Sequence, residues 1–197
     1  MINRRILASG LSIVSALAVM GGATFAFFSD TGTSSSNVFA AGSLDLQLSN
    51  DAVTYSDSVS ATFGGTNMAP GQCLAADALN LKNSGTVAAN HAEVAVSNLV
   101  TDAGNNANPD MDSYLRFQVL NYDGGSEILI ADSNLNGYRD LADLQASGGL
   151  DNLTLTDLNT NHALNVQVCL DGSAPSEIQA DQVDSTFTVT LNQDVSQ

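Results

Sequence analysis

Apolar and polar residues alternate in several short stretches of this 197-residue chain. Successive side chains of a β-strand point to opposite faces of its sheet, so each stretch predicts a strand with one apolar and one more polar face. The stretches are residues 44–48, 115–119, 164–170 and 187–191, with a shorter one at Val94 and Val96. Residues 53–63 are rich in Ser and Thr and are a further, polar strand candidate.

Turn-forming sequences separate these stretches, and many short strands between frequent turns are typical of a β-sandwich. The turns include PG at 70–71, NSG at 83–85, DGG at 123–125 and DG at 171–172. Residues 139–147 are predicted to form one short helix. We therefore expect an all-β domain, a β-sandwich with short helical and loop insertions.

The N-terminal residues have a different character. Arg4 and Arg5 precede an uncharged stretch over residues 6–28, whose apolar centre is typical of a signal peptide. Ala26 is a small residue at a suitable cleavage position. The alternative is a retained transmembrane helix, because about 20 apolar residues can cross a bilayer. The predicted organisation is a signal peptide at 1–26, an N-terminal arm at 27–41 and a β-sandwich domain at 42–197.

The charge of the chain is strongly negative, with five Lys and Arg against 21 Asp and Glu and a net charge of -16. Cleavage after Ala26 lowers this to about -18, because two arginines leave with the signal peptide. Phosphate groups need cationic neutralisation, so nucleic acid and, after processing, a membrane surface are excluded as partners. The charge suits a soluble protein in a salty medium, or one that binds cations.

Two cysteines, Cys73 and Cys169, are present. An even number of cysteines in an exported protein predicts a disulfide, here closing a loop of roughly a hundred residues. The alternative is a pair of free buried thiols. A zinc site is not expected, because two cysteines and two scattered histidines lack the spacing of zinc ligands.

Several motifs follow one another in a distinctive order. The sequence TFAFFSD at 24–30 precedes FAAGSLDL at 39–46, and LKNSGT stands at 81–86. QADQVDS at 179–185 comes before FTVTLNQ at 187–193. These motifs resemble the TasA/camelysin family of secreted biofilm-matrix fibre proteins, whose leaders are removed by SipW-type signal peptidases.

The resemblance implies a jelly-roll β-sandwich secreted to the extracellular matrix or cell surface. It also implies a homopolymer in which the arm of one subunit adds to an open sheet edge of the next, and such a head-to-tail contact generates fibres. The donor residues would be Phe27, Phe28, Ser29 and Asp30. The alternative is that residues 27–41 are a disordered tail.

Residues 132–143 read D-x-N-x-N-G-x-x-D-x-x-D, the spacing of oxygen ligands in an EF-hand-like calcium loop. Gly at the sixth position permits the sharp turn of such a loop. The predicted ligands are Asp132, Asn134, Asn136, Tyr138 through its carbonyl, Asp140 and Asp143. The alternative is an acidic turn before a short helix, without an ion.

Camelysin-like proteins have been described as metalloproteases, so the resemblance also raises an enzymatic reading. The histidines, His91 and His162, lie in no H-E-x-x-H motif, and no nucleophile or phosphate-loop motif occurs. We expect both histidines at the surface, no catalytic residues and no enzymatic activity. A secreted metalloprotease and a monomeric calcium-dependent adhesion module remain the alternatives to a fibre subunit.

Overall fold

The computed structural model describes residues 41–60, 63–103 and 109–194, which belong to one compact unit. The predicted signal peptide and residues 27–40 of the arm lie outside this part of the chain.

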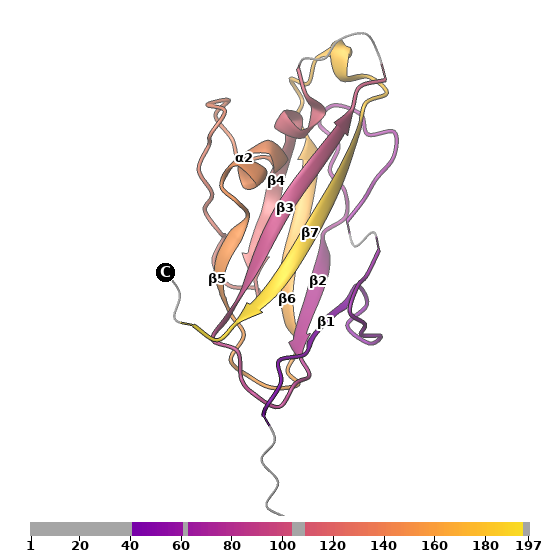
Figure 1. The fold of residues 1–197 in the computed structure, drawn as a ribbon. Coiled ribbons are helices and arrows are strands. Elements are labelled where there is room, and N and C mark those ends of the chain that lie inside the picture. The colour runs from indigo at the N-terminus through magenta and orange to yellow at the C-terminus, as the bar shows by residue number, and fades with distance from the viewer. Residues whose placement is uncertain (1–40, 61–62, 104–108, 195–197) are drawn as a thin grey trace, which may run out of the picture. The chain divides into compact units, whose positions relative to one another are not determined.

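Two antiparallel sheets make up the described part of the chain (Figure 1). One sheet has the strand order β1-β2-β6-β4 and the other the order β5-β3-β7. The strands are β1 (Leu46–Ser49), β2 (Asp77–Asn83), β3 (His91–Thr101), β4 (Leu115–Tyr122), β5 (Leu150–Thr154), β6 (His162–Leu170) and β7 (Gln182–Asn192). The helix α2 (Leu141–Ala146) and the 3-10 turns η1 (Met111–Tyr114) and η2 (Ser176–Ile178) lie between strands. The predicted all-β sandwich with a short helix is confirmed.

The core lies between the inward faces of the two sheets and consists mainly of leucine and valine side chains. Leu81 and Leu164 of the first sheet, Val94 of the second and Leu144 of α2 are all 0% exposed. Burying a side chain of this size stabilises the fold by about 1.5–3 kcal/mol relative to its exposure. The alternation identifies the inward face of β6 correctly.

In β4 the alternation is wrong at Val119, because the pairing with β6 shifts register between Phe117 and Val119, so that Leu120 is the buried residue.

The predicted strands appear where the alternation is regular, and Val94 and Val96 belong to a longer strand than expected, β3. The strand predicted at 53–63 is wrong for the residues that can be judged: only Ser56 pairs with a strand, through one bridge to Leu48. Asp51 explains the difference, because its carboxylate accepts hydrogen bonds from the backbone N–H groups of Val53 and Thr54 and folds the chain into a turn.

Neither β2 nor β5 was among the strands predicted from the sequence. Strand β5 breaks the two-residue period, because its buried Leu150 and Leu153 are three residues apart. Asn152 between them has φ 59°, and the pairing of β3 with β5 shifts register there. A β-bulge of this kind leaves an extra residue in one strand, which sequence alternation alone does not detect.

The turn after β2 explains the NSG sequence at 83–85. Asn83 is 0% exposed, and its carboxamide accepts a hydrogen bond from the N–H of Gly85 and donates one to the carbonyl of Val87. A β-carbon at Gly85 would collide with the backbone of Ser43 and Asp45. A glycine is needed here so that the segment before β1 can pack against this turn.

The predicted disulfide joins Cys73 to Cys169, 96 residues apart. Residues 71–74 run antiparallel to the end of β6, and backbone hydrogen bonds on both sides of the bridge hold them there. The long connection between β1 and β2 is thereby fastened to the first sheet. Its apolar residues, including Phe63, pack against the core.

Replacing both cysteines by serine should lower the free energy of unfolding by about 4 kcal/mol, because the unfolded chain gains the entropy of an open loop. Urea denaturation of the Cys73→Ser/Cys169→Ser variant measures this, with reduced wild type as the control. Equal stability of the variant and the oxidised wild type would contradict the prediction.

Candidate functional site

The outer edge of β7 is the most conspicuous open feature of the sandwich. The strand is eleven residues long and pairs with β3 along its whole length, from Gln182 opposite Thr101 to Asn192 opposite His91. Within the described ranges no strand pairs with its other edge. A full row of backbone N–H and C=O groups is thus left for an additional strand.

The inward side chains of β7 are only half-buried. Phe187, Val189 and Leu191 contact the core but keep intermediate exposure, unlike the fully buried Val94 on the neighbouring strand. The ring of Phe187 meets the edge of the Phe63 ring, with centroids 5.5 Å apart. An apolar strip beside a free edge can therefore accept both the backbone and the side chains of an added strand.

The other edge strands are shorter or already engaged. Strand β1 has four residues and β5 has five. The outer side of β4 is partly occupied by two isolated backbone β-bridges. One joins Arg116 to Asp140 and the other joins Asn121 to Glu127. Natural edges are commonly protected by Lys, Pro or bulges, but β7 contains none of these and has Asp184 as its single charge.

The predicted donor residues Phe27, Phe28, Ser29 and Asp30 lie outside the described residues, so their position relative to β7 stays a prediction.

The acidic loop at 132–143 brings most of its predicted ligands together. The carboxylate of Asp132 accepts hydrogen bonds from the backbone N–H groups of Asn136, at 3.1 Å, and Gly137, at 2.9 Å. The side-chain amides of Asn134 and Asn136 both donate to Oδ2 of Asp140, at 3.0 and 2.7 Å. Tyr138 belongs to the same turn, with its N–H donating to Asn136 Oδ1.

Asp140 and Asp143 form the floor of this loop and are both 0% exposed. They make a reciprocal capping box at the start of α2, in which each carboxylate accepts the other's backbone N–H. Asp143 Oδ1 also accepts the N–H of Ser133, at 2.7 Å. The acidic turn and the short helix, which both interpretations of this segment require, are present. Calcium binding by the predicted ligands stays a prediction.

The fixed cations of the described residues are all engaged away from this loop's carboxylates. Arg116 pairs with Asp171, Arg139 pairs with Glu127, and the Lys82 ammonium lies 4.0 Å from the centre of the Tyr55 ring. Two adjacent buried carboxylates without a cationic partner are costly. Burial, with a smaller contribution from the Asp143 charge, raises the pKa of Asp140 above its ordinary 3.8.

The two histidines lie in strands, and the expectation of a surface position is wrong for His91. Its exposure is 5%, and Nε2 lies 3.2 Å from Oε1 of Glu93. His162 is also largely covered, with Nδ1 2.7 Å from Oδ2 of Asp123 and its ring stacked on Tyr122. His91 is buried because it lies in the central strand of its sheet, between Thr154 and Asn192.

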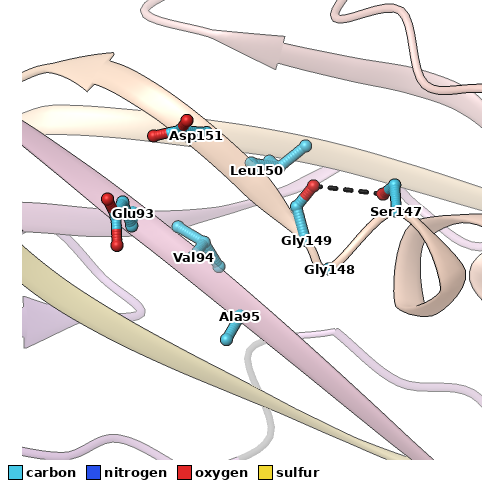
Figure 2. A pocket seen from close by; sticks show the side chains of 8 residues that line it. All are labelled: Glu93, Val94, Ala95, Ser147, Gly148, Gly149, Leu150 and Asp151. Atoms are coloured by element: carbon cyan, nitrogen blue, oxygen red, sulfur yellow. Dashed lines mark hydrogen bonds between the residues drawn. The ribbon is translucent and has the colours of Figure 1, made fainter. Parts of the chain in front are cut away.

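A hollow of about 290 Å³ opens between β3 and the turn that leads into β5 (Figure 2). Its walls include Glu93 and Asp151, which end in carboxylates, and Gly149, whose φ is 107°. A β-carbon at Gly149 would collide with the carbonyl of Val94, so glycine is required for this close approach.

These features define an all-β sandwich with one long open edge and an acidic loop before its short helix. A family model described as camelysin metallo-endopeptidase matches residues 1–195. The chain therefore belongs to the camelysin family, which also includes TasA. A search of curated proteins finds no match. Among the residues that the structure covers, no helix is long and apolar enough to span a membrane.

Calcium should raise the stability of the domain if the acidic loop binds it, by about 2.7 kcal/mol at a calcium concentration one hundred times the dissociation constant. Asp132→Asn should lose this gain, because it removes a charged ligand. Urea denaturation with calcium and with chelator measures both proteins. Asp157→Asn, an equal charge change at an exposed site, is the control; an undiminished calcium effect in Asp132→Asn would contradict the assignment.

The raised pKa of Asp140 predicts a particular pH dependence in chelator. The stabilising contribution of this group is fully present below its unfolded pKa, near 3.8, and is lost as pH rises through the higher folded pKa. The difference in unfolding free energy between wild type and Asp140→Asn isolates this contribution. The unfolding free energy of wild type should rise relative to that of the variant as pH falls from 7 toward about 4. A relative fall over the same pH range would refute the prediction.

Proposed function

We propose that this chain is a secreted structural subunit that polymerises into extracellular fibres by donor-strand exchange. Removal of the leader after Ala26 would free the arm at 27–41, and the arm of one subunit would add to the outer edge of β7 in the next. The single observation that carries the proposal is the eleven-residue free edge of β7 beside a half-buried apolar strip.

The dimensions of the arm suit this edge. A strand rises about 3.3 Å per residue, so about eleven of the arm's residues are enough to pair with β7 along its length. The backbone would supply the hydrogen bonds. Because neighbouring side chains of a strand leave opposite faces, one of Phe27 and Phe28 would pack against the strip that includes Phe187 and Val189, and the other would lie on the outer face. A contact between two different surfaces of one chain repeats without closing, as a fibre requires.

We propose a structural and not a catalytic role, although the family description names a metallo-endopeptidase. Neither His91 nor His162 belongs to an H-E-x-x-H motif, and His162 is paired with Asp123. The calcium proposed for the acidic loop would be a structural ion, which neutralises Asp140 and Asp143 and ties β4's outer side to α2. Calcium is well suited because the loop's potential ligands are all oxygens.

Deleting residues 27–36 from the mature protein should abolish the filaments seen by negative-stain electron microscopy. A peptide of residues 27–41 should bind the shortened protein, and the same peptide with both phenylalanines replaced by serine should bind far more weakly. Filaments that form without the arm would contradict the proposal.

The acceptor edge can be tested separately on β7. Val189→Lys places a charge on the half-buried inner face and should prevent strand addition, whereas Thr188→Lys makes the same charge change on the exposed face and should leave filaments intact. Circular dichroism and urea denaturation establish that both variants fold. If folded Val189→Lys forms filaments as wild type does, β7 is not the acceptor.

A further inference from the structure

A histidine and two carboxylates from two neighbouring strands meet at one end of the second sheet. One potential ligand atom each from His91, Glu93 and Asp151 lies within 4.8 Å of the other two, and within the described residues this is the single such group. We propose that these three side chains bind a zinc ion, or a similar divalent transition metal. The proposal is independent of fibre formation and of the calcium loop.

The backbone explains how the three residues come together. His91 and Glu93 are two residues apart in β3, so their side chains leave the same face of the sheet. The bulge in the pairing with β5 sets Ala92 opposite Leu153 but Val94 opposite Leu150, which leaves two residues of β5 facing Glu93. Asp151 is one of them. Bulges of this kind redirect side chains and are frequent beside functional sites.

The geometry of the pair on β3 already suits a shared ion. His91 Nε2 and Glu93 Oε1 are 3.2 Å apart. Ligand atoms around a tetrahedral zinc are about 3.3 Å apart, because Zn–N and Zn–O bonds are about 2.0–2.2 Å long. Asp151 is exposed, and the Glu93 side chain is 46% exposed. Each carboxylate can therefore change rotamer and move the short distance needed for all three ligand atoms to reach one ion.

The imidazole is held in place before any ion arrives. His91 is 5% exposed and is aimed at the carboxylates, and its other nitrogen, Nδ1, has no hydrogen-bond partner in the part of the chain that is described. Burial fixes the ring, so one nitrogen ligand is preorganised at the base of the group. The hollow beside Glu93 and Asp151 leaves room for water to complete the coordination (Figure 2).

The electrostatic surroundings favour a cation from solution. Lys82, Arg116 and Arg139 are engaged at Tyr55, Asp171 and Glu127, respectively, so none of them neutralises Glu93 and Asp151. An imidazole nitrogen selects zinc and its neighbours over calcium, whereas the all-oxygen loop at 132–143 has the opposite preference. The two sites should therefore bind different ions.

The test is a titration of the mature, metal-free protein with Zn²⁺ by calorimetry, in buffer with excess calcium so that the acidic loop does not compete. A parallel titration with Co²⁺ gives visible absorption bands that report coordination. We expect one equivalent of either metal on wild type, and at least tenfold weaker binding by Glu93→Gln and by Asp151→Asn. Their double variant should show no Co²⁺ bands.

His162→Asn is the matched control, because His162 also faces an aspartate but lacks a third ligand nearby, and it should bind zinc as wild type does. The exposed positions Glu93 and Asp151 carry the test, so it does not depend on whether a variant of the buried His91 folds. Absence of zinc binding in wild type, or equal binding by the folded Glu93→Gln/Asp151→Asn variant, would overturn the proposal.

Discussion

The two sheets of this sandwich are unequal in width, and the long free edge proposed to accept a donor strand belongs to the narrower one. The first sheet has four strands and the second three, and the inward side chains of β7, at an edge of the second sheet, stay half-buried. The connection between β1 and β2 covers part of this region through Phe63, and the disulfide at Cys73 fastens that connection down. Side chains cover the strip there, but the backbone edge of β7 stays open.

A second constraint is the shortage of fixed positive charge. Three Lys and Arg are present in the described part, so most buried carboxylates have no cationic partner and depend on hydrogen-bond donors. Backbone and hydroxyl donors suffice for some of them: hydrogen bonds from Ser173, with help from Arg116, lower the pKa of Asp171. Asp140 differs, because burial outweighs its donors and raises its pKa. A bound cation would stabilise the protein most at carboxylates like Asp140, whose burial is not offset by hydrogen-bond donors.

The sequence predicts the sandwich, the short helix and the turn before it because each depends on residues close together or on simple alternation. The disulfide is predicted although its cysteines are 96 residues apart, because two cysteines in an exported chain allow a single pairing. Leu164, Val166 and Val168 show the inward face of β6 without any knowledge of its neighbours. The family resemblance rests on local motifs of the same kind, and the family match supports it.

The features that the sequence does not predict depend on pairing between residues far apart in the chain. Leu150 and Leu153 do not alternate because of a bulge that exists only in the partnership with β3. His91 is buried by neighbouring strands, and its closeness to Asp151 follows from the same register, so the triad has no compact sequence signature. The H-x-E spacing on a strand is the one local signal of it, and that spacing is too common to identify a metal site.

The pairing of β3 with β7 also has a mechanical consequence. Its hydrogen bonds run perpendicular to the strands and extend over eleven opposed residue pairs. In a fibre joined at the outer edge of β7, tension would act along this strand and load those bonds together in shear. Such a ladder cannot be opened one bond at a time from its end, so a pulled filament would resist rupture within the subunit.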